Sequence, residues 1–377
     1  MTPVRRGTGP GDLLGPRALN RATLARQHLL ARTDRSVPQV VEDLVGLQAQ
    51  APFPPYYGLW SRIAGFAPAD LATLLENRTL VRIVVMRGTI HLVTAADCLT
   101  LRSWVQPVFD RWLIADKERA AGLDGLDVDE VAAAGRALLA ERPMTSKELG
   151  PALQKAFPDA PARSLEFAIR NQVPLVQVPP RAIWGKAGQP TWALVEDWLG
   201  RPIDPAPSAD DLVRRYLAAY GPATVADAQA WCGLTRLGEV VERLLPELRV
   251  FRTDDGATLY DVADAPRPDP DTPAPVRFLA EFDNVLLSYA DRTRIISDAA
   301  RKRVFTVNGL IRGTITVDGA VCGMWRTETK RGTATLVVEP FAKLPTKDIA
   351  ALTAEGHRLL EFAEPETGHD IRFLPVT

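Results

Sequence analysis

Three times along the chain, segments with helical periodicity are followed by two strand-like segments that a turn joins. In the first repeat, residues 80–86 and 89–93 are rich in β-branched side chains and flank the turn Arg87-Gly88. Further hairpins are predicted at 173–194 and at 248–262. Helices followed by a hairpin are the order of a winged helix. The pattern therefore predicts an α+β protein with three tandem winged-helix units.

The last hundred residues have a different pattern. They contain six short strand-like segments, the turn signal Asp318-Gly319 and a helical segment at 347–362. We expect them to form a small antiparallel β-barrel-like domain or a curled sheet, with a helix at the end of the chain. The predicted organisation is a flexible Gly- and Pro-rich tail at 1–16, winged helices at 17–125, 126–204 and 205–265, a Pro-rich linker at 266–275, and the barrel-like domain at 276–377.

Composition narrows the class of protein. With 46% hydrophobic and 24% charged residues, the 377-residue chain is typical of a globular protein of several domains. It has no long apolar run and no apolar region near Met1, so we expect neither a membrane span nor a signal peptide. Cys98, Cys232 and Cys322 lie far apart, which favours a reducing cytoplasm. No His or Cys spacing indicates a metal site and no phosphate loop is present, so no metal or cofactor is expected.

The net charge of −1 hides a strong segregation of charge. Residues 1–32 carry six arginines against Asp12 alone. A second basic segment, 291–312, carries Arg292, Arg294, Arg301, Lys302, Arg303 and Arg312 against Asp291 and Asp298. Because a local patch sets the local field, such segments permit phosphate binding. For any one arginine, solvated surface charge is the alternative.

Two glutamines stand where a helical segment must end. Gln48 and Gln50 follow an amphipathic run, and Pro52, Pro54 and Pro55 prevent the helix from continuing. In extended backbone, residues i and i+2 point to the same side, so both amides could converge on one water molecule. The alternative is that they cap a helix end or bind backbone.

Two further polar positions remain open on the residues alone. His91 lies between Ile90 and Leu92, so it is either a buried structural histidine or a side chain that lines a cleft. Asp283 and Asn284 form either a turn with a side-chain hydrogen bond to the backbone or a second polar cluster.

Several segments together resemble the AlkZ-type tandem winged-helix DNA glycosylases, the type associated with azinomycin resistance. The resemblance covers nearly the whole chain after the tail, and its most specific part is the Gln-x-Gln element. The segments that carry it are Ala18-Leu19-Asn20-Arg21, Gly46-Leu47-Gln48-Ala49-Gln50-Ala51-Pro52, Gly58-Leu59-Trp60, Met86-Arg87-Gly88-Thr89-Ile90-His91-Leu92-Val93 and Glu281-Phe282-Asp283-Asn284.

The resemblance implies a C-shaped clamp on double-stranded DNA. It also implies hydrolysis of the N-glycosidic bond of N7-alkylated purines, including interstrand crosslinks, by a monofunctional enzyme that uses water as the nucleophile. Gln48 and Gln50 match the catalytic pair, with the small Ala49 between them. We expect a monomer in the cytoplasm, associated with the nucleoid. The predicted DNA-binding residues are Arg87, His91, Arg292, Arg294, Arg301, Lys302, Arg303 and Arg312, and the strand pair near 308–325 is the predicted DNA-probing hairpin.

Two other functions stay open at this stage. A DNA-binding transcriptional regulator would use the same winged helices to read sequence and would break no bond. A sugar or nucleotide hydrolase would require paired carboxylates. Glu42 and Asp43 precede the glutamines, but adjacent residues of a helix point in different directions.

Overall fold

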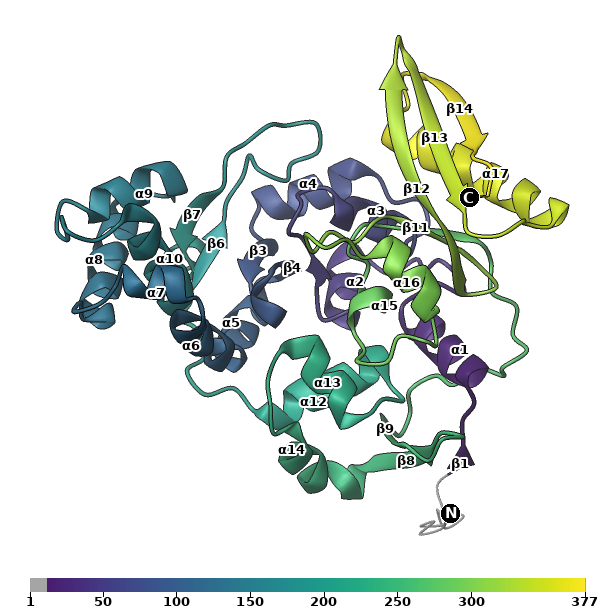
Figure 1. Ribbon diagram of the computed structural model, residues 1–377, viewed down its shortest axis with the longest axis horizontal. Helices are drawn as coiled ribbons and strands as arrows, with labels where there is room; N and C mark the ends of the chain where they lie inside the picture. Colours follow the sequence, from purple (N-terminus) through teal and green to yellow (C-terminus); the bar gives the residue numbers. More distant parts are fainter. Residues whose placement is uncertain (1–11, 377) are drawn as a thin grey trace.

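The computed structural model describes residues 12–376 (Figure 1). Residues 1–11 of the predicted tail lie outside the described residues. Residues Asp12–Leu13 form strand β1, which pairs in parallel with β8 (Leu248–Arg252). The prediction of a loose tail is wrong for this stretch, because its backbone pairs with an edge strand of the third hairpin. Helix α1 (Pro16–Arg26) then starts on a proline, the residue whose missing amide costs least at a first helical position.

The first region contains the helices and strands around the glutamine pair. Before α2, the backbone N of Ser36 donates to Gln39 Oε1 at 3.1 Å, and Pro38 lies in the first turn. The remaining elements are α2 (Val37–Asp43), β2 (Leu47–Gln48), α3 (Pro54–Trp60), α4 (Pro68–Glu76), β3 (Leu80–Val84), the 3₁₀ turn η1 (Met86–Gly88), β4 (Ile90–Thr94), α5 (Ala95–Trp104), α6 (Gln106–Ala115) and α7 (Lys117–Ala121).

The order of three helices and a hairpin occurs again in the second and third regions. Figure 1 shows the second region on the left and the third below the centre. The second region contains α8 (Val128–Glu141), β5 (Met144–Thr145), α9 (Ser146–Leu153), α10 (Ala162–Gln172), β6 (Leu175–Gln177), β7 (Thr191–Leu194) and α11 (Val195–Leu199). The third contains α12 (Ala209–Tyr220), α13 (Val225–Cys232), α14 (Leu237–Leu244), the 3₁₀ turn η2 (Leu245–Glu247), β8, and β9 (Thr258–Val262).

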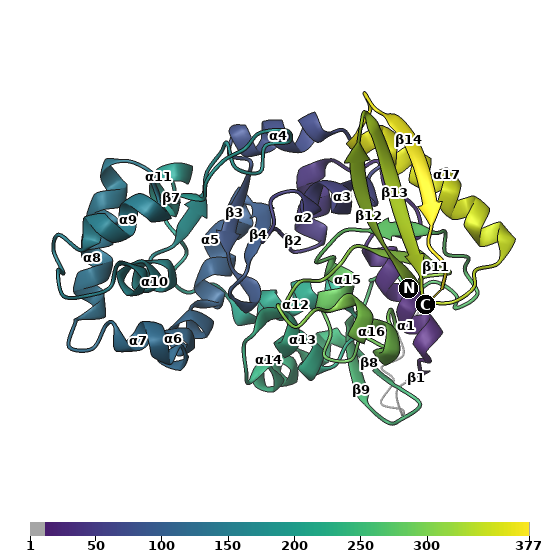
Figure 2. The same cartoon turned by 45° about the horizontal axis from the view of Figure 1, so that its top comes forward.

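The hairpins of the first two regions join into one six-stranded sheet, ordered β2-β4-β3-β6-β7-β5 (Figure 2). Strands β3 and β6 are antiparallel, with Arg82 opposite Gln177 and Ile83 opposite Val176. Backbone pairing between two edge strands depends little on side-chain identity, so no residue pattern predicts this junction. Its consequence is that the second region is tied by backbone hydrogen bonds to the strands around the glutamine pair.

The C-terminal region is an open sheet ordered β10-β11-β12-β13-β14. Strands β13 and β14 are parallel, and within residues 12–376 the edge strands β10 and β14 do not pair. Of the two predicted forms the barrel is therefore wrong, because the sheet is open. The predicted antiparallel pairing holds from β10 to β13 and is wrong for β13 and β14. A long helix between β13 and β14 provides the crossover that parallel pairing requires. The elements are β10 (Arg277–Leu279), α15 (Asn284–Leu287), α16 (Asp298–Val304), β11 (Thr314–Val317), β12 (Ala320–Lys330), β13 (Thr333–Pro340), α17 (Thr346–Ala363) and β14 (Gly368–Phe373).

Two segments predicted as strands in this region are not strands. Residues 285–287 lie in helix α15, where Asp283 caps the first turn by accepting from the Val285 amide at 3.2 Å. The segment 304–307 ends helix α16 and enters a turn. Both are short apolar runs, for which periodicity alone does not separate a strand from a buried helix.

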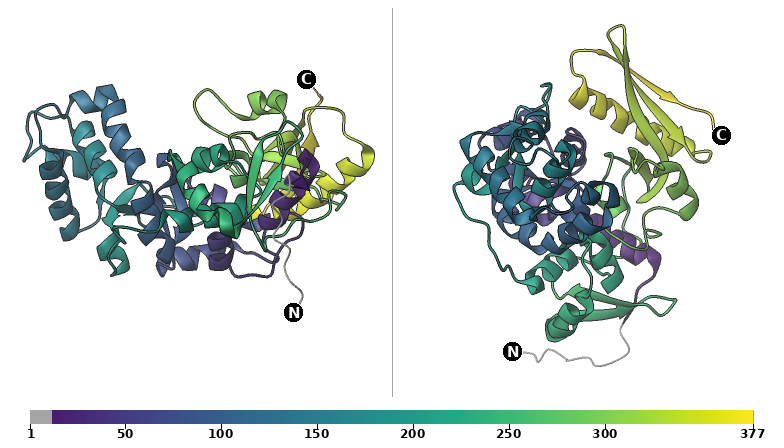
Figure 3. Two further views of the ribbon diagram at one scale, coloured as in Figure 1. Left: turned by 90° about the horizontal axis from the view of Figure 1, so that it is seen from below. Right: turned by 60° about the vertical axis from the view of Figure 1, so that its left-hand side comes forward.

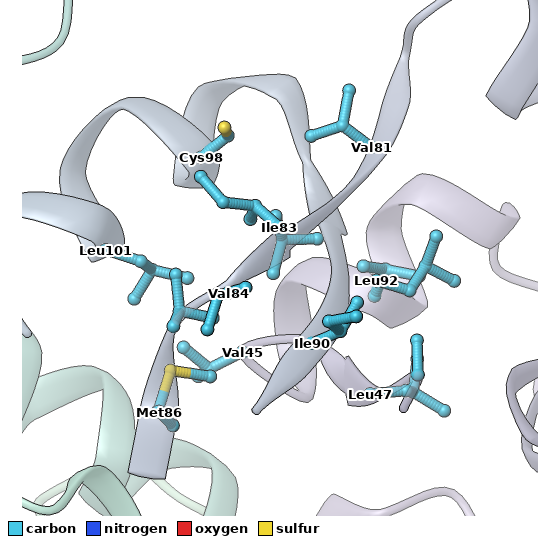
Figure 4. Close-up of a cluster of buried hydrophobic side chains, with 14 of the residues drawn as sticks. Val45, Leu47, Val81, Ile83, Val84, Met86, Ile90, Leu92, Cys98 and Leu101 are labelled. Atoms are coloured by element: carbon cyan, nitrogen blue, oxygen red, sulfur yellow. The ribbon is translucent and has the colours of Figure 1, made fainter. Parts of the chain in front are cut away.

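An apolar core holds the short strand β2 in place (Figure 4). Leu47 lies opposite Leu92 of β4, and both side chains are buried together with Val45, Ile83 and Ile90. Burying each of these side chains contributes about 1.5–3 kcal/mol. The core therefore fixes the register of β2 and, with it, the direction of the next side chain, Gln48.

The regions are spread along the longest axis of the molecule (Figure 3). The linker at 266–275 has no helix or strand and lies against α1, where Arg21 Nε donates to the Thr272 carbonyl at 2.6 Å. None of the helices within residues 12–376 combines the length and apolar composition that a bilayer crossing requires.

Candidate active site

The two glutamines differ in exposure but bind the same β3–β4 hairpin. Gln48 lies in β2 and is 7% exposed, whereas Gln50 follows the strand and is exposed. Arg87 Nη2 donates to Gln48 Oε1 at 2.9 Å. The Ile90 amide donates to Gln50 Oε1 at 3.1 Å. Arg87 lies in the turn of this hairpin and Ile90 begins β4, so the hairpin orients the oxygen of each amide.

The backbone between the glutamines is held on both of its polar atoms. The Ala49 amide donates to the Ile90 carbonyl at 2.7 Å, and the Ala49 carbonyl accepts from Arg82 Nη2 at 2.7 Å. Arg82 is buried, and its other terminal nitrogen donates to Gln177 Oε1 at 2.7 Å. Removing either partner would leave a buried polar group unpaired, which costs about 1–3 kcal/mol. Residue 49 also has no exposed surface, and its small alanine fits this enclosed position.

The chain enters β2 through a tight turn with two residues in the left-handed region. Val45 has φ +52° and Gly46 has φ +90°. A Cβ on Gly46 would lie 2.9 Å from the Leu92 carbonyl oxygen, so only glycine fits here. From the far side, Asn284 Nδ2 donates to the Gly46 carbonyl at 2.8 Å, and the Tyr220 hydroxyl donates to the Leu44 carbonyl at 2.7 Å. The turn before the glutamines is thus fixed by the third and C-terminal regions.

The Asp283-Asn284 pair combines the two interpretations that the sequence left open. Asp283 caps helix α15 through the Val285 amide, and its carboxylate also accepts two hydrogen bonds from Arg62, at 2.8 and 2.9 Å. The Arg62 and Asp283 side chains are at most 1% exposed. A buried, bidentate pair of this kind fixes Asn284 against the Gly46 carbonyl.

Arg87 and His91 lie beside Gln48. Arg87 adopts φ +54° in turn η1, and its Nη1 donates to the Trp231 carbonyl of α13. His91 lies directly opposite Gln48 in the β2–β4 pair, 3.5 Å from Arg87 Nη2. Its Nδ1 donates to the Thr89 carbonyl at 2.9 Å, which leaves Nε2 as the acceptor. Both of these predicted site residues therefore lie next to Gln48.

Burial decides the protonation states of this pair. Burial, and then the neighbouring Arg87 charge, lower the pKa of His91 to about 3. Burial also lowers the pKa of Arg87 to about 10. At neutral pH the imidazole is therefore neutral while the guanidinium remains charged. The site has a fixed positive charge next to Gln48 and no histidine poised to take a proton.

Glu281 and Arg292 border the same site. Glu281 shares a small pocket with Gln48, Pro54 and Gly58, and partial burial raises the pKa of its carboxyl group. Arg292 lies near enough to Arg87 for its charge to lower the Arg87 pKa. The Arg292 guanidinium stacks 5.0 Å from the Phe305 ring, and its buried Nε has no partner among the described residues.

The other predicted DNA-binding residues divide into two groups. Arg294 is 9% exposed and donates to the Pro222 carbonyl at 2.9 Å, and Arg303 pairs with Glu339 at 3.0 Å. Arg294 is committed inside the protein, so the prediction that it contacts DNA is wrong in this structure. Arg301, Lys302 and Arg312 are exposed.

The turn of the predicted probing hairpin is docked on the protein. Asp318, at the β11–β12 turn, pairs with Arg17 at 2.6 Å and with Arg21, while Asn20 Nδ2 donates to the Gly319 carbonyl at 2.9 Å. This end of the 308–325 strand pair therefore cannot probe DNA. The preceding turn at 306–310 is free, and it presents fully exposed Val307.

A cleft of about 730 Å³ opens beside Gln50. One wall comes from turn η1 and helices α6 and α7, and the other from α10 of the second region. The lining residues are Gln50, Val84, Gly88, Thr89, Phe109, Trp112, Ala115, Asp116, Arg119, Arg163, Glu166, Phe167, Arg170 and Asn171. Within residues 12–376 no three His, Cys, Asp or Glu side chains gather as metal ligands.

Sequence reasoning missed the residues that position the glutamines. Arg82, Tyr220 and Trp231 are separated from them by tens of residues or more and carry no motif. One signal was present for Arg82, since it is the only charged residue in the apolar segment 80–86. A charge on an otherwise buried strand requires a partner, and here that partner is the Ala49 carbonyl.

Comparisons with known proteins identify the family of the chain. The family model described as AlkZ-like DNA glycosylase matches residues 41–362. An interstrand DNA cross-link repair glycosylase from Streptomyces sahachiroi is 26% identical over 355 residues, which cover 86% of this chain and 91% of that protein. The solved structure of Streptomyces sahachiroi DNA glycosylase AlkZ shares the fold, with a TM-score of 0.78 and 22% identity over 96% of this chain and 100% of that one. The chain belongs to the AlkZ-like family and is a DNA glycosylase.

Proposed function

We propose that this glycosylase hydrolyses the N-glycosidic bond of N7-alkylated purines in double-stranded DNA and unhooks purines that are crosslinked between strands. The relative from Streptomyces sahachiroi is named for interstrand cross-link repair, which supports this substrate class. The observation that carries the proposal is the pair Gln48 and Gln50, whose amide oxygens are oriented by Arg87 in the β3–β4 turn and by the Ile90 amide of β4.

The chemistry needs a positioned water more than a strong base. N7-alkylation already places a positive charge on the purine, so the C1′–N9 bond can break without an added acid, and its electron pair neutralises the base. Each amide oxygen has two lone pairs, of which one accepts from Arg87 or Ile90. The second lone pair of Gln48 and Gln50 can accept from a water held below the sugar, and the same oxygens favour an oxocarbenium-like transition state.

Water is the proposed nucleophile in a monofunctional reaction. Among the described residues that line the two pockets around the pair, none is a lysine that could form an imine with the sugar. The pKa of His91 is about 3, so its imidazole is too weak a base to keep a proton at pH 7, and the proton of the attacking water passes to solvent. A crosslinked base cannot rotate into a closed pocket, and the open cleft beside Gln50 suits such a substrate.

We propose that three winged-helix units and the C-terminal sheet hold the duplex as a monomeric clamp in the nucleoid. The phosphate contacts assigned to this surface are Arg292, Arg301, Lys302 and Arg312, with Arg87 and His91 at the bond that breaks. The free turn at 306–310 carries Val307 and Leu310, which are 103% and 56% exposed. Exposed apolar side chains among basic residues suit insertion between base steps.

The contacts of the predicted wings and recognition helix argue against the transcriptional regulator. The first wing is turn η1 at the glutamines, and the third pairs with β1. The second wing is docked on α3, where the Tyr56 hydroxyl donates to the Ala182 carbonyl at 2.7 Å. The third helix of the second region, α10, faces α6 and α7, and its Arg163 pairs with Glu118 at 2.7 Å. None of these elements is free to enter a groove as a regulator would require.

The test measures base release from a duplex that carries one N7-methylguanine or one N7–N7 crosslink. We expect abasic sites with the wild-type enzyme, and loss of release with retained DNA binding in Gln48→Ala/Gln50→Ala. Binding without release on both substrates would support the regulator. Release that survives the double substitution would exclude the glutamines as the catalytic pair.

A second variant tests whether the orientation of Gln48 affects the rate. Arg87→Ala removes the donor that orients Gln48, and a misplaced group of this kind costs on the order of 10²-fold in rate. Arg17→Ala, at an exposed ion pair of the β11–β12 turn, is the matched control and should leave the rate unchanged.

A further inference from the structure

We propose that the cleft between helices α6–α7 and helix α10 receives the substituent carried by the damaged base, and that Trp112 is its stacking platform. The substituent class is a planar aromatic group attached to the purine. This inference rests on the proposed function, because it assigns substrate preference to a surface that adjoins the proposed site. It concerns residues outside the glutamine pair.

The position of the cleft makes it part of the reaction site. Gln50, Gly88 and Thr89 form one end of its lining, and the last two belong to the β3–β4 hairpin that orients both glutamine oxygens. A base held over the pair would therefore project its substituent either into solvent or into this cleft.

The volume of the cleft is much larger than a small substituent would fill. A methyl group would leave almost all of the 730 Å³ empty, whereas pockets of about 300–1,000 Å³ bury drug-sized molecules. The cleft is open along one side, so a substituent that still continues into DNA or into a second base can enter without passing a closed rim.

Trp112 presents an aromatic surface that the protein leaves uncovered. It is 40% exposed, which is unusual for a tryptophan next to a buried core. Its ring is seated on Gly88, where a Cβ would lie 2.2 Å from the ring atom Cη2. Phe109 supports it edge-on, with the ring centroids 6.3 Å apart. The ring is thus fixed in place from behind and remains available for stacking.

The opposite wall adds polarisable and charged groups. Phe167 of α10 lies under the Arg119 guanidinium at 5.3 Å, and Arg170 of the same face lies 3.9 Å from Glu166. Aromatic rings with fixed guanidinium groups bind planar aromatic ligands by stacking and by cation–π attraction. Such a wall suits an extended ring system that carries oxygen or nitrogen atoms.

The test compares a small and a large substituent on the same base. Duplexes would carry one N7-methylguanine or one N7-(anthracenylmethyl)guanine, and single-turnover rates and half-saturating enzyme concentrations would be corrected for release without enzyme. The variants are Trp112→Ala, Trp112→Phe, and Trp198→Ala as the matched tryptophan control. Trp198 lies on α11, where Arg78 stacks on its ring at 4.1 Å, and it does not line the cleft. Thermal unfolding of each variant would establish that it folds.

We expect Trp112→Ala to lose roughly tenfold or more in efficiency on the anthracenyl substrate, since stacking on one aromatic ring has about this value. The methyl substrate should change less than twofold, Trp112→Phe should recover most of the loss, and Trp198→Ala should behave as wild type. An equal loss on both substrates would overturn the proposal, because Trp112 would then act only by supporting Gly88. No loss on either would overturn it as well.

The wild-type enzyme separates failure of this inference from failure of the proposed function. If it releases N7-methylguanine but not the anthracenyl base, the cleft does not accept the substituent and the glycosylase assignment stands. If it releases neither base, the substrate class proposed above fails together with this inference.

Discussion

Two segments of the chain are rich in arginine, and most of their arginines lie in different environments. In helix α1, Arg21 is 1% and Arg26 5% exposed, and their guanidinium groups bind acceptors inside the protein. In the segment 291–312, Arg301, Lys302 and Arg312 are exposed, and Arg292 stacks on Phe305 with an unpaired Nε among the described residues. The first group joins the regions to one another, and the second presents exposed cationic groups that the proposed function assigns to DNA.

The difference shows that the local environment, and not the count of charges, decides what an arginine does. Arg26 donates to both oxygens of the buried Asp261, at 2.7 and 2.8 Å, and to the Leu217 carbonyl at 2.8 Å. These acceptors come from the third region, hundreds of residues away in the chain. A basic segment can therefore bind nucleic acid only if its side chains are not already bound to acceptors inside the protein.

The largest expected effect comes from breaking the internal group. Arg26→Met leaves Asp261, which has no exposed surface, with Arg267 as its remaining partner. Removing one member of a buried pair costs about 3–5 kcal/mol, and Arg267 should hold the loss near about 3 kcal/mol. Urea unfolding with an unchanged slope would measure it. A loss below about 1 kcal/mol would show that the α1 arginines are not structural.

A second test concerns His91, which is buried like Arg21 and Arg26 but is neutral at pH 7. The pKa of His91 is about 3 in the folded protein, below the ordinary value of 6.5, so the unfolded chain binds the extra proton between these pH values. Stability therefore rises with pH through this window and falls in acid. Between pH 6.5 and 5 the wild type should lose about 1.6 kcal/mol more than His91→Gln. Parallel pH curves for the two proteins would show that His91 titrates normally.

The sequence was sufficient for the features that local rules determine. The first hairpin is confirmed by β3 and β4, because β-branched runs around Arg87-Gly88 leave few other folds. The end of a helix before Gln48 is likewise confirmed, since α2 stops at Asp43 and an extended residue follows at Leu47. The mixed α+β fold also agrees with the solved relative.

What could not be predicted depends on contacts between distant segments. The Ala49 carbonyl binds Arg82, the Gly46 carbonyl binds Asn284, and the β11–β12 turn binds α1. No spacing rule links such partners. The barrel alternative was wrong for the same reason, because the parallel pairing of β14 with β13 depends on where α17 packs. The roles of Gln48 and Gln50 remain predictions.

The exposed group should affect DNA binding and leave folding unchanged. We expect Arg301→Ala/Lys302→Ala/Arg312→Ala to unfold within about 0.5 kcal/mol of wild type. Its affinity for duplex DNA should fall roughly tenfold at physiological salt, and the slope of log K against log salt should decrease by about 2–3, close to 0.9 for each lost phosphate contact. A fluorescence anisotropy titration at several salt concentrations would measure both. An unchanged slope would place the DNA path elsewhere on the molecule.

The smallest effect is expected from an α1 arginine that points outward. Arg17 is half exposed and pairs with the half-exposed Asp318 at 2.6 Å, on the same helix face as the buried Arg21. Surface ion pairs contribute about 0–1 kcal/mol, so Arg17→Ala should lower stability by less than about 1 kcal/mol and should not change the salt slope of DNA binding. Because Arg17 has the same side chain and helix as Arg26, a small loss here and a large one there would isolate burial as the cause. A reduced salt slope in Arg17→Ala would instead extend the DNA surface onto α1 and remove the contrast between the two segments.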